Sequence, residues 1–240
     1  MKKRKGGFAC LGDSITSEQM TGIGTLICRK LETPLFGNFA CGWATGSDWH
    51  RDGNILTQFS LEVPINSFCA ENVLSNQVFR LLQQAQDTGC SPAIVYIAIS
   101  ANDGANGGYA EKSPVPLVDD AEQICALEYS QLTRTSLAGA LRWAIETIQR
   151  NFSDIRIYAA SPLQAYAPGY EEGALSEQVL LLKREIIQKV CVCCGITFID
   201  SYYESGFTKE IAKNHGEVHP DTEWADRIAD YVAGKISENL

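Results

Sequence analysis

Five short apolar runs recur along the chain, and helix-like segments separate each run from the next. The apolar runs are residues 8–11, 35–41, 93–99, 155–160 and 196–200. The helix-like segments are residues 17–31, 73–87, 128–152, 175–193 and 222–237. Strands that alternate with helices form a parallel sheet with right-handed crossovers, and a run as apolar as 93–99 is typical of a strand buried on both faces. The pattern predicts an α/β fold, with irregular segments at 43–72, 101–127, 161–174 and 201–221.

Length and charge limit the domain organisation and the partners of such a fold. The chain has 240 residues, 45% of them hydrophobic, so we expect residues 8–240 to form a single domain around one sizeable core. The net charge of −9 disfavours nucleic acid and other polyanions as main partners. No stretch reaches the about 18 apolar residues of a membrane span, so we expect no membrane partner.

The N-terminal residues 1–7 contain the basic run Met1-Lys2-Lys3-Arg4-Lys5, which we interpret as a solvated tail. The apolar stretch that follows is shorter than the about 7–15 residues of a secretory signal. Most of the nine cysteines lie in apolar runs, and the cluster Cys191-Val192-Cys193-Cys194 lacks the partner ligands of a closed zinc site. We therefore expect buried reduced thiols, a cytoplasmic location, and neither a metal nor another cofactor.

The segment Gly12-Asp13-Ser14-Ile15-Thr16 lies between the first apolar run and the first helix-like segment. A serine on such a turn is presented to solvent beside free backbone N–H groups, which is where a nucleophile belongs. The alternative is a serine that only caps the helix. Two further segments in a compatible order, Ser100-Ala101-Asn102-Asp103 and Val218-His219-Pro220, favour the nucleophile.

Together these three segments resemble the SGNH/GDSL hydrolases, a family of serine esterases, from residue 8 to about residue 232. The resemblance implies a flavodoxin-like, three-layer α/β/α sandwich with a five-stranded parallel sheet. It also implies a Ser–His(–Asp) centre, with an oxyanion hole made by the serine N–H, a backbone N–H of a second block and an asparagine side chain. The usual substrates of such enzymes are small esters, lipids and acylated sugars.

The resemblance makes Ser14 the nucleophile and His219 the general base, which takes the serine proton and returns it to the leaving alcohol. His215 is a competitor four residues away, but a His-Pro pair just before the last helix matches the family pattern. The remaining histidine, His50, falls in an irregular segment, and we interpret it as a surface residue.

The acid of the centre departs from the family pattern. The family usually carries an aspartate three residues before the histidine, where this chain has Gly216. Glu217 is one candidate to orient the imidazole, and a backbone carbonyl or a water, which would leave a Ser–His dyad, is the other. Loss of the acid need not abolish activity, because in subtilisin it costs roughly a hundredfold less than loss of the serine or the histidine.

Asn102 is the expected side-chain donor of the oxyanion hole. A preorganised amide at the developing alkoxide contributes about 2.7–4 kcal/mol. The family pattern is Gly-x-Asn-Asp, and here Ser100 replaces the glycine with little added bulk. The alternative role of Asn102 is an Asx turn at the end of a strand.

The second block lies within residues 37–46, where Asn38-x-Ala40-x-x-Trp43-x-Thr45 resembles the family's Asn-x-Ala-x-x-Gly-x-Thr. The backbone donor of the oxyanion hole then falls on Trp43, with Gly42 as the alternative after a small shift of register. The Trp43 indole is also a candidate wall for an acyl group or a sugar ring. Asp13 either fixes its turn or helps to shape the substrate site.

The resemblance thus implies a metal-independent serine ester hydrolase that acts on a small-molecule or carbohydrate ester. We favour an O-acetylated carbohydrate over a lipid, because the loops are polar and no long apolar lid segment is visible. Loop aromatics that could stack on a sugar are Trp49, Tyr109, Tyr166 and Tyr170. The absent aspartate motivates an alternative, namely a catalytically weak relative that binds glycans or acyl groups.

Overall fold

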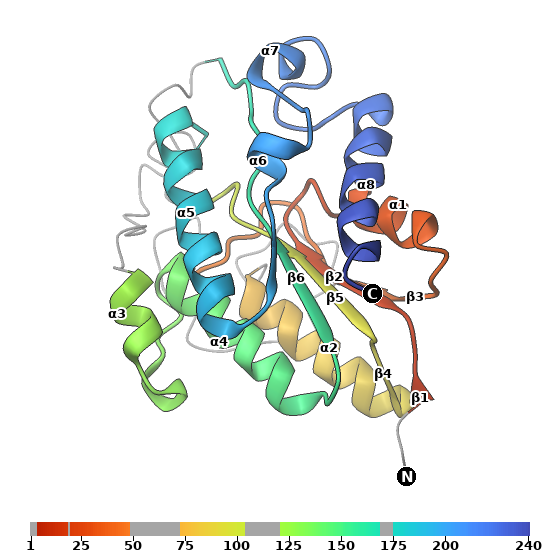
Figure 1. Cartoon of the computed structure of the whole chain (residues 1–240), viewed down its shortest axis with the longest axis vertical. Helices are drawn as coiled ribbons and strands as arrows, with labels where there is room; N and C mark the ends of the chain where they lie inside the picture. The colour runs from red at the N-terminus through yellow and green to blue at the C-terminus, as the bar shows by residue number, and fades with distance from the viewer. Residues whose placement is uncertain (1–3, 19, 49–72, 104–120, 169–174) are drawn as a thin grey trace.

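The computed structural model describes residues 4–18, 20–48, 73–103, 121–168 and 175–240. A central sheet runs through the molecule, and helices cover both of its faces (Figure 1). The sheet consists of five parallel strands in the order β3-β2-β5-β6-β7, which is the flavodoxin-like order. These strands are β2 (Phe8–Gly12), β3 (Leu35–Asn38), β5 (Ile94–Ala98), β6 (Arg156–Ala160) and β7 (Thr197–Ile199). The predicted α/β/α fold with a five-stranded parallel sheet is therefore confirmed.

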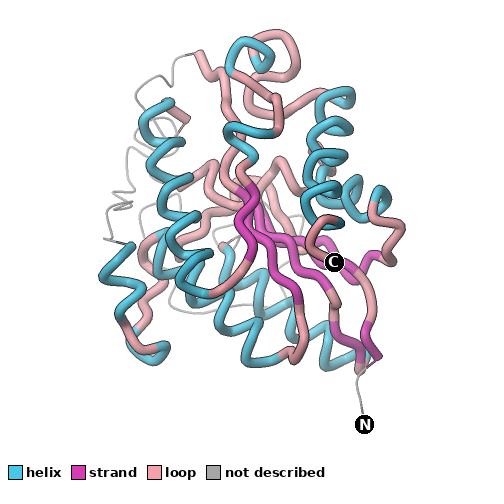
Figure 2. Tube along the Cα trace, in the orientation of Figure 1, coloured by secondary structure: helices cyan, strands magenta, loops and turns pink. Residues whose placement is uncertain are grey.

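Two helical layers enclose the sheet (Figure 2), and strands β2, β5, β6 and β7 contribute side chains to both cores. One layer consists of α2 (Leu74–Thr88), α4 (Leu137–Asn151) and α5 (Glu177–Cys194), and the other of α1 (Ile23–Lys30) and α8 (Thr222–Ser237). On β2, Ala9 and Leu11 belong to the core beneath α2, α4 and α5, whereas Phe8 and Cys10 belong to the core beneath α1 and α8. Because side chains alternate across a strand, a strand between two layers must be apolar at every position, which explains the continuous run at residues 8–11.

The first helix begins later than the predicted range of 17–31. Residues before Ile23 form tight turns instead, because the backbone N–H groups of Thr16 and Ser17 both donate to the carbonyl of Asp13. These turns place the segment after β2 at the carboxyl edge of the sheet, where parallel α/β proteins bind ligands.

The predicted helix 128–152 is divided. A short 3₁₀ turn, η1 (Tyr129–Gln131), comes first, and α4 starts only after Ser136, whose hydroxyl accepts a hydrogen bond from the Gly139 N–H. A serine N-cap satisfies a backbone donor that would otherwise lack a partner, so it fixes the start of the helix there.

Short helices and strands also form in segments that were predicted to be irregular loops or a solvated tail. The irregular ranges contain the helices α3 (Ala121–Ala126), α6 (Ser201–Glu204) and α7 (Lys209–Ala212). Part of the N-terminal run expected to be a solvated tail is a strand, because β1 (Arg4–Lys5) pairs in parallel with β4 (Cys90–Ser91). Most of the irregular segment 43–72 lies outside the described residues, as do His50, Trp49, Tyr109 and Tyr170.

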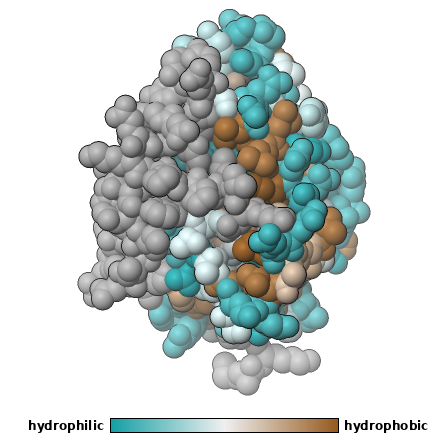
Figure 3. Space-filling model, turned by 90° about the vertical axis from the view of Figure 1, so that its left-hand side faces the viewer, coloured by the Kyte–Doolittle hydropathy of each residue, from teal (hydrophilic) through white to brown (hydrophobic). Residues whose placement is uncertain are grey.

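The surface on the side of α5 mixes apolar and hydrophilic regions (Figure 3). Helix α5 exposes two apolar side chains, since Leu182 and Val192 are 37% and 76% exposed. The same helix fully buries a charged residue, Lys183. The eight cysteines in the described part of the chain are free thiols. None of the described helices has the length and the apolar composition needed to cross a bilayer.

Candidate active site

Ser14 lies on the turn that follows β2, at the carboxyl edge of the sheet, and is 8% exposed. The turn depends on Gly12, because a Cβ at that position would collide with the Ala98 carbonyl oxygen and the Thr16 side chain. Gln77 of α2 holds Gly12 from the other side: its Nε2 donates to the Gly12 carbonyl and its Oε1 accepts from the Gly12 N–H, both at 2.8 Å. The backbone before the serine is thus fixed by packing and by two hydrogen bonds.

His219 reaches Ser14 from the other end of the chain. Its Nε2 lies 2.8 Å from the Ser14 Oγ, although 205 residues separate the two in sequence. His219 precedes Pro220 and the N-cap of α8, Asp221, whose side chain accepts from the Trp224 N–H. Burial lowers the pKa of His219, and the charge of Asp13 opposes this effect. The imidazole is therefore neutral near pH 7, as a general base must be.

Gly216 explains why the acid of the family pattern is absent. Its φ is +105°, in a region that side-chain-bearing residues rarely adopt, and a Cβ built there would lie 2.0 Å from the His219 carbonyl oxygen. The Gly216 carbonyl also accepts the His219 N–H at 2.9 Å, which closes a tight turn. An aspartate does not fit this turn, so the turn that presents His219 excludes the usual acid.

The structure does not bring Glu217 to the imidazole. Glu217 is exposed and its φ is 59°, and its backbone N–H donates to the Ala212 carbonyl at 2.7 Å. Among the described residues, no hydrogen bond or ion pair joins any carboxylate to the His219 ring. The competitor His215 instead has its Nδ1 at 2.9 Å from the Asp221 carboxylate. Of the two arrangements expected from the sequence, the Ser–His dyad is the one that this geometry contains.

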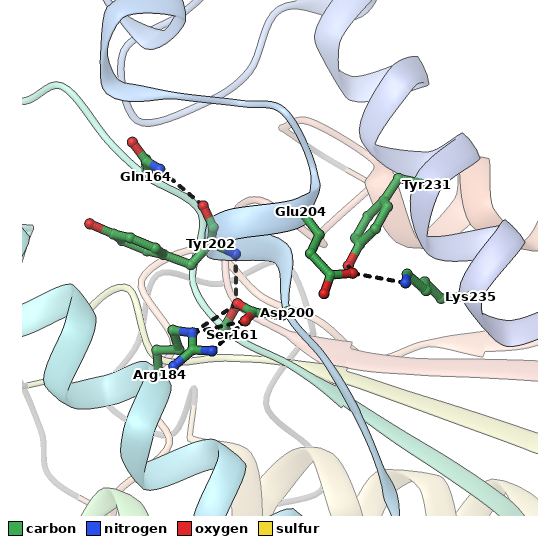
Figure 4. A network of polar contacts seen from close by, with 8 residues as sticks. All are labelled: Ser161, Gln164, Arg184, Asp200, Tyr202, Glu204, Tyr231 and Lys235. Atoms are coloured by element: carbon green, nitrogen blue, oxygen red, sulfur yellow. Dashed lines mark hydrogen bonds and ion pairs between the residues drawn. The ribbon is translucent and has the colours of Figure 1, made fainter.

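The loop that contains His219 rests on the segment that follows β6. Gln164 Nε2 donates to the Tyr202 carbonyl at 3.0 Å (Figure 4). Gln164 Oε1 accepts from the Lys209 N–H at 3.0 Å. Nearby, the Tyr166 N–H donates to the Glu217 carbonyl at 3.5 Å. Figure 4 also shows Ser161, Arg184, Asp200, Glu204, Tyr231 and Lys235. The segment after β6 thus contacts both the start of α7 and the loop that carries His219.

Asn102 follows β5 on the same edge of the sheet. Its Nδ2 donates to the Ala44 carbonyl at 2.8 Å, which links the loop after β5 to the second block. An amide nitrogen carries two N–H groups, so the contact with Ala44 orients the amide and leaves one donor for a ligand.

Asp13 is buried and holds backbone rather than facing a ligand. One carboxylate oxygen accepts from the Ile15 N–H at 3.1 Å, and the other accepts from the N–H groups of Ser100 and Ala101 at 3.3 and 3.2 Å. Burial raises the pKa of this carboxyl group. Of the two roles expected for Asp13, these contacts fit the fixing of the turn and not substrate binding.

Trp43 adopts the backbone conformation that favours glycine. Its φ is 63°, and the indole side chain is 39% exposed. Gly42 is not among the glycines with positive φ. The left-handed conformation of a tryptophan costs about 1–2 kcal/mol, and strain of this kind occurs preferentially at functional sites. Position 43 is therefore where the backbone requires the conformation of the family's glycine.

Three residues that support the site were not expected from the sequence: Gln77, Asp103 and Lys183. Asp103 accepts from the N–H groups of Gly46 and Ser47 at 2.7 and 3.0 Å, so it holds the second block. The burial of Lys183 could have been predicted from its position in the helix. It is spaced three or four residues from apolar residues of α5, so it lies on the same buried face as they do. No pattern along the chain identifies the partner of Gln77.

An open groove lies on the α8 side of His219. Residues before and within α1 form much of its lining, among them Glu18, Thr21, Thr25 and Arg29. No group of three or more metal-ligating side chains occurs in the described ranges. The site therefore combines a serine and a neutral imidazole next to a groove lined by both polar and apolar side chains.

Comparison with known proteins establishes the class of fold. No family model and no curated protein matches the chain. Solved structures do match: a lipase/acylhydrolase from Enterococcus faecalis has a TM-score of 0.58 at 14% identity, and the alignment covers 99% of this chain and 97% of that one. A carbohydrate acetylesterase from Sinorhizobium meliloti has a TM-score of 0.53 at 14% identity, with 99% and 100% covered. A protein described as a GDSL-like lipase from Bacteroides ovatus has a TM-score of 0.54 at 13% identity, with 98% and 100% covered. The chain therefore has the fold of GDSL-type lipases and esterases.

Proposed function

We propose that this protein is a serine ester hydrolase of the SGNH/GDSL type that acts on a small acyl ester. The observation that carries this proposal is the 2.8 Å contact between Ser14 Oγ and His219 Nε2 at the carboxyl edge of the sheet. A serine hydroxyl becomes a competent nucleophile when a base lies within hydrogen-bond distance, and a neutral imidazole is such a base. The fold shared with esterases and acylhydrolases supports the same reaction class.

The reaction proceeds in two acyl-transfer steps. Ser14 Oγ attacks the ester carbonyl carbon while its proton passes to His219 Nε2, and the imidazolium then gives this proton to the leaving alcohol oxygen. Water attacks the resulting acyl-enzyme, with His219 again as the base, and releases the carboxylic acid and free Ser14. The Ser14 N–H, the Asn102 amide and the N–H of Trp43, or of Gly42, stabilise the oxyanion.

None of the described residues supplies the imidazole with an acid partner, and this shapes the expected kinetics. For Nε2 to accept the serine proton, the proton of the neutral imidazole must lie on Nδ1, and in a triad the acid fixes this tautomer. Here the turn closed by Gly216 positions His219 through the backbone. We expect a working enzyme with a modest kcat, because removal of the acid in subtilisin costs about 10⁴-fold.

For the substrate we propose an O-acetylated carbohydrate. His219 lines an open groove that also contains hydroxyl and charged side chains, and these would suit a polar alcohol. The structural similarity to a carbohydrate acetylesterase supports the same choice. Turnover of acetylated sugars and of long-chain p-nitrophenyl esters should be compared directly, and equal turnover of the two would contradict the choice.

The first test is the hydrolysis of p-nitrophenyl acetate by the wild type and by Ser14→Ala. Ser17→Ala is a matched control, because Ser17 is buried in the same turn and its described hydrogen bonds go to other residues than His219. We expect turnover in the wild type and in Ser17→Ala, and none above background in Ser14→Ala. Turnover that survives in Ser14→Ala would refute the proposed nucleophile.

A second candidate is a catalytically weak protein that binds glycans or acyl groups. The turn at Gly216, which excludes the usual acid, is the observation that favours it. Binding of an acetylated oligosaccharide by calorimetry, together with no Ser14-dependent turnover of any ester, would support this candidate over the hydrolase.

A further inference from the structure

Lys183 is a buried cation near the proposed oxyanion hole. It lies in the middle of α5, is fully buried, and shares the buried side of the helix with Leu180, Ile187 and Val190. Burial of an ammonium group is costly unless hydrogen bonds and opposite charges compensate, so a lysine in such a place is expected to have specific partners.

Among the described residues, Lys183 contacts the segment that carries Asn102. Its Nζ donates to the Ala101 carbonyl at 3.1 Å. Burial lowers the pKa of Lys183 to about 8, and the charges of Asp103 and Asp13 act in the opposite direction. The ammonium group therefore interacts with the residues immediately before and immediately after Asn102, and with the aspartate next to the nucleophile.

The carboxylates of Asp13 and Asp103 each hydrogen-bond to the backbone of a different part of the site. Asp13 accepts from the N–H groups of Ser100 and Ala101, so it ties the loop after β5 to the nucleophile turn. Asp103 accepts from the N–H groups of Gly46 and Ser47, so it ties the same loop to the second block. The charges of both carboxylates act on the Lys183 ammonium group, and Asn102 lies between the two attachment points.

We propose that Lys183 is a positioning residue that sets the Asn102 amide in the oxyanion hole, through the Ala101 carbonyl and the buried carboxylates of Asp13 and Asp103. This inference rests on the proposed ester hydrolase function. Lys183 does not touch the reacting atoms. It bonds the carbonyl of the peptide before Asn102 and places a positive charge near the two carboxylates that hold the loop, so its effect on turnover passes through Asn102.

The test is a double-mutant cycle on kcat with Lys183→Met and Asn102→Ala. Methionine keeps the length of the aliphatic chain and removes the charge and the donor. Asn102→Ala should lower kcat about 10²–10³-fold, as loss of one oxyanion donor does. Lys183→Met should lower kcat about 10- to 100-fold with KM within about twofold, because a small displacement of a catalytic group has an effect of that order. The double variant should be no slower than Asn102→Ala by more than about threefold, because the two changes remove one interaction.

The controls separate positioning from stability. Lys189→Met changes a lysine of the same helix whose side chain is 53% exposed, and it should leave kcat unchanged. Because Lys183→Met leaves two buried carboxylates without their cation, Lys183→Gln, which retains an N–H donor, is prepared in parallel. Circular dichroism and thermal unfolding show which variants fold, and the cycle uses any variant that does.

A measurement without turnover keeps the inference separate from the proposed function. The Asn102 side-chain NH₂ signals in an ¹⁵N–¹H spectrum are identified by their loss in Asn102→Ala. They should shift in the folded Lys183 variant and stay unchanged in Lys189→Met. Absence of Ser14-dependent turnover would refute the hydrolase alone, and the NMR result would still decide the role of Lys183. Multiplicative losses of kcat, an unshifted Asn102 signal, or failure of both Lys183 variants to fold would each overturn the positioning role.

Discussion

Replacement of Gly216 by aspartate would put a carboxylate three residues before His219, where the SGNH/GDSL sequence pattern has its acid. On sequence grounds alone, Gly216→Asp should raise the rate of the proposed ester hydrolysis. The structure predicts the opposite, because the turn that presents His219 has no room for a side chain at position 216. We expect Gly216→Asp to lower both the stability of the fold and the rate of ester hydrolysis.

The size of the effect follows from the geometry of the turn. A side chain at φ +105° is strained, and the left-handed region costs a residue with a Cβ about 1–2 kcal/mol. The Cβ would lie 2.0 Å from the His219 carbonyl oxygen, so the two peptides must separate by about 1 Å. This movement weakens the hydrogen bond from the His219 N–H to the Gly216 carbonyl, which contributes about 0.5–1.5 kcal/mol. Together these effects predict a loss of about 2–3 kcal/mol in the free energy of unfolding, or about 4–12 °C in Tm.

Urea unfolding and p-nitrophenyl acetate hydrolysis test this prediction together. The midpoint for Gly216→Asp should fall without a change in the m-value, and kcat should fall about a hundredfold, because His219 moves by about 1 Å. Gly216→Ala has the same Cβ without the carboxylate and should lose nearly as much stability. Glu217→Ala should keep kcat within about twofold, since the exposed carboxylate has no contact with the imidazole. A Gly216→Asp variant that is as stable as the wild type and faster would refute the steric argument.

Two further predictions concern the imidazole and the second block. Because burial lowers the pKa of His219, the neutral base persists below the ordinary histidine value of 6.5, so the acid limb of kcat/KM should have its midpoint below 6.5. Asp13→Asn removes a charge that raises this pKa and should move the midpoint still lower; a midpoint above 6.5 in the wild type would contradict the assignment. At position 43, where φ is 63°, Trp43→Gly should be about 1 kcal/mol more stable than Trp43→Ala in urea unfolding, because only glycine avoids the strain of the Cβ. Equal stability of the two variants would show that Trp43 is unstrained.

The fold was predictable because helices cover both faces of the sheet, and this arrangement requires the strands to be apolar at nearly every position. A strand such as β5, covered by helices on both faces, must be apolar throughout, and the run 93–99 has this composition. The starts of α1 and α4 were not predictable from periodicity. They depend on local hydrogen bonds, namely those accepted by the Asp13 carbonyl and by the Ser136 hydroxyl.

The site was predictable only where residue type and position in a motif carry the information. Ser14, Asn102 and His219 follow strands or precede the last helix, and the parallel topology brings such positions to one edge. The pairing of Gln77 with Gly12, 65 residues away, depends on tertiary packing and leaves no local pattern. The steric need for Gly216 depends on the carbonyl of His219 itself, so the sequence shows a missing acid but not the reason for it.

The anchoring of the site by Gln77, Asp13, Asp103 and Lys183 has a consequence for protein engineering. These four side chains are buried, and together they attach the nucleophile turn, the second block and the loop after β5 to the helices and strands. Exposed groove residues such as Arg29 take no part in these attachments. Directed evolution of specificity should therefore find tolerant positions along the groove, whereas libraries that vary the buried anchors should yield mostly inactive clones.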